Sequence, residues 1–510
     1  MTAVAAFALV LVLAMALGIY SKRGVKTTED FLVGGRSFGG LLLFILVVGE
    51  VYSIGTVVGF PGGVYAEGAG FAVWFMGYIL LGYPIGYFLL PLLFKAGRRY
   101  SAVTLPDILR GHFNSRPLEL TAALLSVIFL IPWAQLQLTG LTVALTGLGL
   151  GLTPVVTVMI GVTIALAFAL LSGIKAPAYV SFVKDFALVF AIIAVAVFVL
   201  AMNSSIPDIA TQADALSGHT TIGPGRPMLH TMSTMLFQAV GFYMFPFVVQ
   251  AIMSSKSART IKRTQIGMPL YMLMYPFLLI TAYYSISAVP GLTGANTNLA
   301  FIEVARALLP EFLVGIVAGA AALCAIVVLA ASALSIGTLV ARNVLVAVPE
   351  KRQKNYVRAI IAAYLLISIV LTLVVPNLMG TLINTAYYGF TQLIVPVALL
   401  IFGSRTRAGV MAAGLAGGVL ATLGLYISGI DLGGLSIGVP ALAVNLAIVT
   451  LGRLIWPRTT PTEAIWTRGH PRSEWARTPG PDSNPTSSTR SGRQGKTIDT
   501  SAEELGPWMK

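Results

Sequence analysis

Three ionisable side chains lie inside apolar stretches of this sequence that are long enough to cross a membrane. Glu50 follows one apolar run, and Lys184 and Asp185 are neighbours within another. A charged side chain at the centre of a bilayer costs about 2.5 to 3.5 kcal/mol on insertion scales, so such residues are functional candidates. Carboxyl and amino groups held there can bind and release a proton, and a carboxylate can also attract a cation. We therefore predict that these three residues take part in ion coupling.

Each of these residues also has a structural interpretation. The Glu50 carboxyl can accept hydrogen bonds from backbone N–H groups that a broken helix leaves free. The Lys184 side chain can extend toward the membrane surface and place its ammonium in water. Neighbouring residues point about 100° apart on a helix, so Lys184 and Asp185 need not pair. Both interpretations stay open at the level of sequence.

Uncharged polar side chains in the apolar stretches are the candidates for binding a polar solute. The predicted solute-binding residues are Tyr52, Gln135, Gln137, Gln238, Tyr243 and Gln392. Hydrogen bonding between helices, worth about 0.6 to 2 kcal/mol, explains any one of them as well. A separation of two residues on a helix corresponds to a rotation of about 200°, so we expect only one of Gln135 and Gln137 to face the solute.

Ser332 and Ser335 are three residues apart and therefore share a helix face. They can help to bind an ion, or they can serve as small residues that let two helices approach closely. The sequence has no phosphate-binding loop, HExxH or CxxC motif, and its four histidines are scattered. We predict a protein without enzymatic activity and without a cofactor, apart from Na⁺ or H⁺ as a coupling ion.

The apolar stretches that carry these residues dominate the chain. Its 510 residues are 56% hydrophobic and 10% charged, whereas soluble domains have roughly 25% charged residues. Windows of about 20 apolar residues predict an all-α polytopic membrane protein with about 13 transmembrane helices. The predicted spans are 2–20, 38–61, 70–96, 117–148, 154–173, 177–201, 229–253, 264–289, 311–341, 355–375, 379–403, 408–428 and 435–456.

Two of these spans, five apart, contain residues that interrupt a helix. The first, 38–61, carries Gly49, Gly55 and Gly59, and the second carries the segment 241–246, which begins with Gly and ends with Pro. Paired interrupted helices are typical of a binding site at the membrane midplane of a transporter. An unwound backbone at this depth is tolerated only where protein or a water-filled cavity satisfies its polar groups. The breaks therefore predict where a solute or an ion is held.

The basic residues fall on one side of the predicted membrane. With the N-terminus outside, the loops after spans 1, 3, 7, 9 and 11 carry most of the lysines and arginines that lie outside the C-terminal segment, and only Arg226 and Arg306 fall opposite. This bias marks cytoplasmic loops. The net charge of +14 thus predicts a topology and no nucleic-acid partner. We expect a multi-pass protein of the plasma (inner) membrane, surrounded by lipid, with its C-terminus in the cytoplasm.

The composition changes after the last span. Residues 457–510 are rich in Pro, Ser, Thr, Arg and Gly, and such a segment cannot bury enough apolar surface to fold. We predict a transmembrane domain over residues 1–456 and a disordered cytoplasmic tail over 457–510.

Several segments carry a resemblance to a known family. They are TEDFLVGGRS at 28–37, TLPDIL at 104–109, and a third segment that carries Gln250, Lys256-Ser257 and Lys262-Arg263. In this order, over about the first 350 residues, the sequence resembles the solute:sodium symporter family. Further segments resemble the branch of bacterial monocarboxylate permeases within that family, namely GEVY at 49–52, VKD at 183–185 and GFYMFP at 241–246.

The resemblance implies a leucine-transporter type fold, with spans 2–6 and 7–11 as inverted five-helix repeats and with alternating access. It implies a symporter for the uptake of a small organic solute, a monocarboxylate. It also places Asp185 near the family's sodium site and Gln392 in the helix that contacts the solute. The alternative is a transporter-like sensor that signals through its cytoplasmic tail.

One position departs from the family pattern. The family's sodium site uses paired hydroxyl residues on span nine, where this sequence has Val328 and Leu329. Shifting the alignment by one residue places Val327 and Val328 there, which are also apolar. Apolar side chains cannot replace the oxygen ligands that a hard cation needs. Coupling to sodium or to protons therefore stays open. A Lys184 ammonium near a vacant cation site can stand in for sodium and couple transport to the proton gradient.

Overall fold

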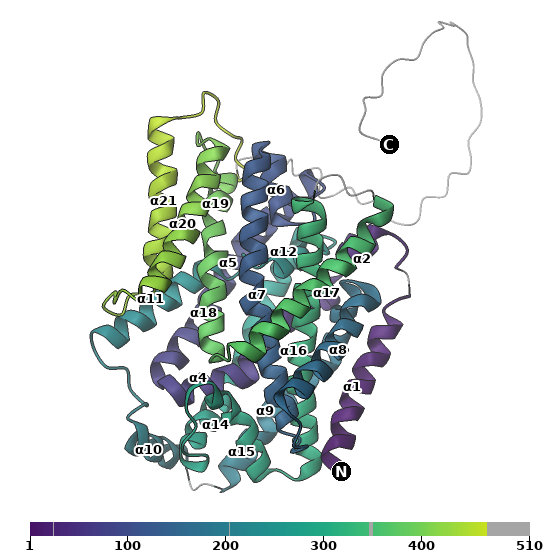
Figure 1. The fold of residues 1–510 in the computed structure, drawn as a ribbon, viewed down its shortest axis with the longest axis vertical. Coiled ribbons are helices and arrows are strands. Elements are labelled where there is room, and N and C mark those ends of the chain that lie inside the picture. Colours follow the sequence, from purple (N-terminus) through teal and green to yellow (C-terminus); the bar gives the residue numbers. More distant parts are fainter. Residues whose placement is uncertain (24, 203–204, 346–349, 467–510) are drawn as a thin grey trace, which may run out of the picture. The chain divides into compact units, whose positions relative to one another are not determined.

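The computed structural model describes residues 1–466 except 24, 203–204 and 346–349, and this described part is built from helices (Figure 1). It contains no strand; an isolated bridge joins Phe38 to Ser255. The helices of the first half are α1 (Thr2–Tyr20), α2 (Thr28–Val33), α3 (Gly40–Val51), α4 (Phe60–Glu67), α5 (Ala69–Arg99), α6 (Leu105–Phe113), α7 (Arg116–Thr146), α8 (Pro154–Ser172) and α9 (Lys175–Met202).

The second half of the described chain is also helical. Its helices are α10 (Ile206–Ser217), α11 (Arg226–Gly241), α12 (Pro246–Met253), α13 (Ala258–Gly267), α14 (Tyr275–Ala288), α15 (Ala300–Leu308), α16 (Glu311–Leu339), α17 (Glu350–Val374), α18 (Met379–Phe390), α19 (Ile394–Phe402), α20 (Ala408–Ser428) and α21 (Gly438–Ile455). Short π or 3₁₀ segments that the argument uses are η2 (Gly55–Gly59), η3 (Met268–Met274), η5 (Val340–Val344) and η6 (Thr391–Leu393).

The spans agree closely with the expected ones. In the described part, 11 helical segments are long and apolar enough to cross a membrane, and the bent pair α3 and α4 makes a twelfth. The remaining predicted span, 154–173, corresponds to α8, whose apolar stretch is described over Val155–Ile164. The membrane-spanning, all-helical architecture is therefore confirmed.

Both predicted helix breaks are present. The first separates α3 from η2 at residues 52–54, and the two halves of this span are bent by 42°. The second separates α11 from α12 at residues 242–245. Pro246 begins α12, where its missing N–H costs no hydrogen bond. In α4, after the first break, Gly62 is required by packing, because a Cβ there would lie 2.8 Å from the backbone oxygen of Thr297.

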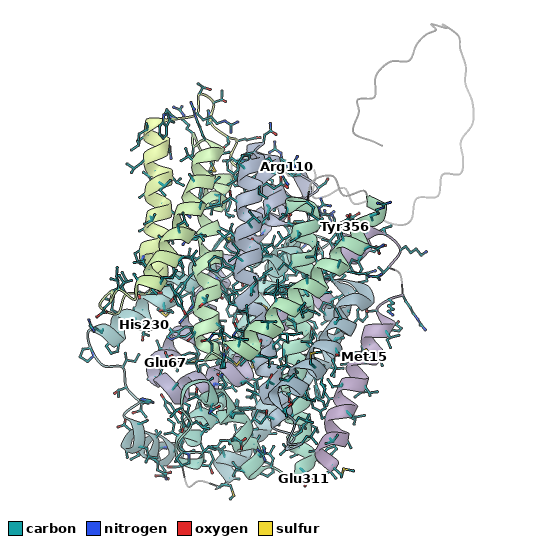
Figure 2. The ribbon with its side chains drawn as sticks, viewed as in Figure 1. Met15, Glu67, Arg110, His230, Glu311 and Tyr356 are labelled. Carbon is teal, nitrogen blue, oxygen red and sulfur yellow. The ribbon has the colours of Figure 1, made fainter. Side chains whose placement is uncertain are left out.

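α16 is the central span, and it is buried over most of its length. Glu311, at its start, lies at the opposite end of the helical bundle from Arg110 and Tyr356 (Figure 2). The predicted inner segments before α3 and before α6 lie together, since Arg36 Nη2 donates to the backbone oxygen of Ala102 at 2.9 Å.

The predicted tail begins later than residue 457. Arg458 N donates to the backbone oxygen of Arg405 at 2.6 Å, and Thr462 N donates to that of Ser404 at 2.8 Å. An ion pair of 3.0 Å joins Glu463 to Arg99 on α5. These contacts fix residues 457–466 against the bundle, so the expected disorder of this part is wrong. Residues 467–510 lie outside the described part of the chain.

Candidate functional site

The first helix break is closed by a lysine from another span. Lys184 lies nine residues into α9, about 14 Å along the helix axis from Lys175. Its side chain is fully buried, and Nζ donates to the backbone oxygens of Gly49 at 3.2 Å and Tyr52 at 2.9 Å. The carbonyl groups at a helix C-terminus carry partial negative charge and lack helical partners, so they attract a cation. The alternative in which Lys184 extends to the membrane surface is therefore wrong.

Asp185 completes the surroundings of this ammonium. Its Oδ1 lies 2.7 Å from Lys184 Nζ, which makes a buried ion pair between sequence neighbours. Three oxygen atoms thus lie within 3.2 Å of Nζ. A lysine ammonium has three N–H donors and no acceptor, so this arrangement matches the protonated form.

Glu50 lies beside this cluster, in the last turn of α3. Its side chain is buried, and neither carboxyl oxygen has a hydrogen-bond partner among the described residues. It is close enough to Lys184 for the two side chains to interact electrostatically. The structural interpretation, in which the carboxyl bonds free N–H groups of the break, is not what the structure shows. A buried carboxyl group without partners is a group that can take up or release a proton.

Gln137 lies between the two helix breaks. On α7, the Trp133 ring contacts Phe245 of the second break in a tilted arrangement, with ring centroids 4.7 Å apart. Gly140 packs against Ile54 of the first break, where a Cβ would lie 2.1 Å from the Ile54 side chain. Gln137 is four residues after Trp133 and three before Gly140, so it shares their helix face. Its amide is fully buried, with no hydrogen-bond partner for either polar atom in the described part of the protein.

Gln135 has a different environment. Its Nε2 donates to the backbone oxygens of Leu371 at 3.3 Å and Val375 at 2.6 Å, at the C-terminal end of α17. As expected for two residues about 200° apart, Gln135 and Gln137 therefore point to different neighbours. Gln135 joins two helices, whereas the Gln137 amide bonds to none of the described residues.

Aromatic side chains connect the two breaks. The Tyr52 and Tyr83 hydroxyl groups form a short hydrogen bond, and the Tyr83 ring lies edge-on to Phe242 at 6.3 Å. Tyr83 belongs to α5, so this helix contacts both breaks. Tyr243 donates its hydroxyl to Gln265 of α13. The two predicted tyrosines, 52 and 243, thus lie at the two breaks and form part of one aromatic shell.

The two remaining predicted glutamines are bonded to neighbouring helices. Gln238 Nε2 donates to Asn384 Oδ1 at 2.5 Å, while its Oε1 has no partner among the described residues. Gln392, in η6, accepts a hydrogen bond of 3.0 Å from Asn445 Nδ2 of α21 and donates to the backbone oxygen of Tyr388. Of these two glutamines, only Gln238 has an amide atom without a hydrogen-bond partner among the described residues.

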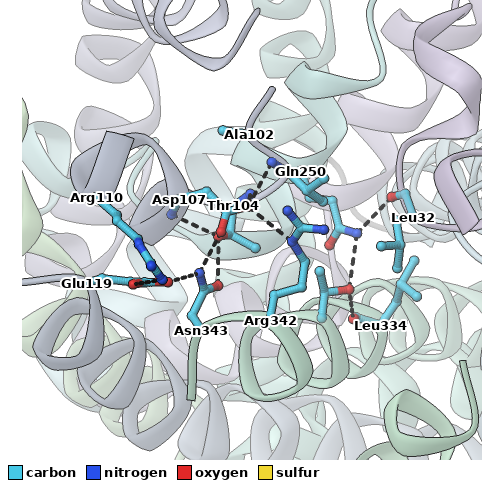
Figure 3. Close-up of polar contacts among 12 residues, drawn as sticks. Leu32, Ala102, Thr104, Asp107, Arg110, Glu119, Gln250, Leu334, Arg342 and Asn343 are labelled. Carbon is cyan, nitrogen blue, oxygen red and sulfur yellow. Dashed lines mark hydrogen bonds and ion pairs between the residues drawn. The ribbon is translucent and has the colours of Figure 1, made fainter. Parts of the chain in front are cut away.

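The two serines of α16 also have different hydrogen-bond partners. The Ser332 hydroxyl donates to the backbone oxygens of Val328 and Leu329 in its own helix, at 2.8 and 3.0 Å. The Ser335 hydroxyl donates to Gln250 Oε1 of α12 at 2.6 Å. Gln250 Nε2 donates to the backbone oxygen of Leu32 at 2.7 Å (Figure 3). Each hydroxyl thus donates its hydrogen to a protein oxygen.

Sequence reasoning missed a polar network at the end of the bundle that carries α6. Asp107 binds Asn343 Nδ2 at 2.6 Å and Arg342 Nε at 3.2 Å, both in η5 at the end of the α16 span (Figure 3). Asn343 Nδ2 also donates to Glu119 of α7 at 2.9 Å, and Glu119 pairs with Arg110 of α6 at 2.9 Å. The available signal was Asp107, which closes a capping box with Thr104 at the start of α6.

This network lies on the side of the membrane that the sequence predicts to be cytoplasmic, and we call it the inner network; it ties three helices together. Its members come from α6, α7 and the end of the α16 span, and Glu119 and Asn343 are buried. A buried charge that keeps its partners rigidifies the elements that carry it, whereas loss of one partner is costly. The network therefore links α6, α7 and the end of the α16 span to one another.

Comparisons with known proteins agree with this architecture. A model of the sodium:solute symporter family matches residues 31–417. The chain is 30% identical over 455 residues to an uncharacterized symporter of Bacillus subtilis, YhjB, covering 87% of this chain and 93% of that protein. It is 30% identical over 306 residues to a monocarboxylate transport permease protein of Rhizobium johnstonii, covering 58% of this chain and 61% of that protein.

Solved structures show the fold. A Na⁺-coupled sialic acid symporter in a substrate-bound outward-open state superposes with a TM-score of 0.73 at 17% identity, covering 91% of this chain and 99% of that one. MhsT in complex with L-phenylalanine gives 0.54 at 15% identity, covering 81% and 98%. The predicted leucine-transporter type fold is confirmed by these likenesses. Since the family model matches most of the sequence, the chain belongs to the sodium:solute symporter family.

Proposed function

We propose that this chain is a secondary active symporter that takes up a monocarboxylate by alternating access, driven by an ion gradient. The observation that carries the proposal is the buried, unpartnered amide of Gln137 between two broken helices. In transporters of this construction the solute is held at the midplane, where broken helices supply free backbone groups. The amide Nε2 is a donor that suits a carboxylate oxygen, and Oε1 is an acceptor for a hydroxyl group.

The aromatic shell suits the rest of such a molecule. Phe245 packs against Tyr387 and Phe390, with ring centroids 5.0 and 4.4 Å apart. Ligand sites are largely apolar with a few placed polar groups that fix orientation. A short acid with a small apolar body matches this combination. The named activity of the Rhizobium relative gives the same substrate class.

The proposal is tested by uptake into proteoliposomes that contain the purified protein. Labelled lactate, pyruvate and acetate are offered with imposed ion gradients, and protein-free liposomes are the control. We expect at least one acid to accumulate above its equilibrium level. Equilibration without accumulation would indicate a channel. Labelled proline is offered as the alternative substrate, because relatives from Escherichia coli and Salmonella typhimurium are named sodium/proline symporters. Accumulation of proline with none of the acids would contradict the monocarboxylate assignment.

A further inference from the structure

The Lys184 ammonium occupies the position at the first break where a coupling cation is expected. In transporters with broken helices, the C-terminal end of a half-helix and the unwound carbonyls next to it bind the coupling ion. Here the backbone oxygens of Gly49 and Tyr52 are those groups, and both already accept hydrogen bonds from Lys184 Nζ. The protein itself thus supplies the positive charge at this break.

The local packing is built around this lysine. A Cβ at Gly49 would lie 2.2 Å from Ser181 Oγ and 3.7 Å from Lys184 Cε, so only glycine lets α9 approach α3 this closely. On the neighbouring α16, Val327 and Val328 are buried and apolar. They offer no side-chain oxygen to a hard cation, whereas the Lys184 ammonium already has two backbone hydrogen bonds and the ion pair with Asp185.

Loss of the proton from Lys184 would break this arrangement. A neutral amine keeps two N–H donors and gains a lone pair, while three oxygens surround Nζ. One of the three contacts must then become repulsive, which weakens the connection between α9 and the end of α3. Other ionisable side chains interact electrostatically with this cluster, namely Glu50 from α3, Asp185 on α9, Cys324 from α16 and Tyr271 from η3.

We propose that Lys184 carries the coupling proton, so that transport by this chain runs on a proton gradient and needs no sodium at the first break. The inference rests on the proposed function. From the outside, the amine takes one proton from water and becomes an ammonium, the form that suits the three oxygens around Nζ. On the inner side, the ammonium returns that proton to water and becomes the amine again. One proton thus enters with each monocarboxylate anion, and the combined movement carries no net charge.

The test measures uptake of labelled lactate, pyruvate and acetate in sodium-free proteoliposomes with an acidic exterior. We expect at least one acid to accumulate several-fold above equilibrium, and we expect no accumulation when a sodium gradient is imposed at equal pH. Accumulation that requires the sodium gradient would overturn the inference while leaving the proposed symporter standing. Failure of all three acids to accumulate or exchange under any gradient would instead overturn the proposed function itself.

Two variants assign the proton to this residue. Lys184→Arg keeps a cation that does not release its proton, and Lys184→Gln removes the charge. For both we expect proton-driven accumulation to fall to the equilibrium level. The rate at which Lys184→Arg exchanges labelled for unlabelled solute should stay within about threefold of the rate of the unmodified protein. This factor corresponds to about 0.7 kcal/mol. Exchange also reports that the variant is folded.

The matched control is Lys22→Gln, which removes an exposed lysine between α1 and α2. It should accumulate solute as the unmodified protein does. Full proton-driven accumulation by Lys184→Arg would overturn the inference, because a residue that keeps its proton cannot carry one across the membrane.

Discussion

Gln135 and Gln137 lie two positions apart on α7 and have opposite surroundings. We expect Gln137→Ala to raise the KM for the solute about threefold to tenfold, because it removes a hydrogen bond worth about 0.5 to 1.5 kcal/mol. Its effect on thermal stability should be small, since the amide has no partner among the described residues. The measurement is initial uptake rate against solute concentration.

The control for that prediction is Gln135→Ala. This change leaves the backbone oxygens of Leu371 and Val375 without the amide donor, so it should lower the free energy of unfolding by about 1 kcal/mol and leave KM unchanged. Thermal unfolding in detergent measures the first effect. A raised KM in Gln135→Ala together with a normal KM in Gln137→Ala would contradict the assignment.

His112, on α6, makes a pH-dependent contribution to stability. Burial, together with the nearby Arg99 guanidinium, lowers the pKa of His112 to about 4, below its usual 6.5. Because the folded-state pKa is below the unfolded one, this contribution is present above about pH 6.5 and is lost as the pH falls toward 4. The neutral ring keeps its 3.0 Å hydrogen bond between Nδ1 and the Tyr100 hydroxyl.

We therefore expect the unfolding temperature to fall between pH 7 and pH 4.5, and to fall less in His112→Phe. Thermal unfolding of the purified protein at the two pH values provides the measurement. An identical fall in both proteins would show that His112 does not contribute.

At the scale of elements, α2 and α6 begin with the same motif but serve different neighbours. Asp30 closes the capping box of α2 with Thr27, and Asp107 closes that of α6 with Thr104. Only Asp107 also binds the end of the α16 span, through Arg342 and Asn343. A comparison of variants at Asp30 and Asp107 therefore separates the contribution of helix capping from that of the inner network.

Asp107→Asn should cost more stability than Asp30→Asn. Hydrogen bonds to charged groups are worth about 1.5 to 3 kcal/mol, and Asp107→Asn weakens two of them in addition to the cap. We also expect Asp107→Asn to change the rate of transport, since it weakens the contacts that join α6 to the end of the α16 span. Thermal unfolding and initial uptake rates measure the two effects. Equal losses in both variants would show that capping alone matters.

At the scale of the whole molecule, the described residues 1–466 contain both breaks, the Lys184 cluster and the inner network. A chain shortened to end at residue 466 should therefore take up solute at a rate within about twofold of the full chain, a difference of about 0.4 kcal/mol. Uptake in proteoliposomes is the measurement. Loss of transport would revive the alternative of a sensor that works through its C-terminal tail.

A second truncation marks where the bundle ends. Ending the chain at residue 456 removes the ion pair between Arg99 and Glu463 and the backbone bonds made by Arg458 and Thr462. We expect this shorter chain to be less stable by about 1 to 2 kcal/mol, the size of a few weak hydrogen bonds and an exposed ion pair. Thermal unfolding of the two truncated chains compares them directly.

The sequence by itself determined the spans, the two breaks and the unusual ionisable residues. These features are local: apolar runs of membrane length, Gly and Pro within them, and Glu50, Lys184 and Asp185 at depth in them. The family resemblance was likewise carried by short segments that the family model later confirmed. Local composition is enough here because lipid permits few backbone structures across a membrane.

Only the tertiary structure decided which partner each polar side chain has. Lys184 reaches the backbone of Gly49 and Tyr52, more than 130 residues earlier, and Ser335 reaches Gln250 of α12. It also separated Gln137 from Gln135. Such choices depend on which helices pack together and how they are rotated, and an apolar run without a strong polar face does not specify that rotation.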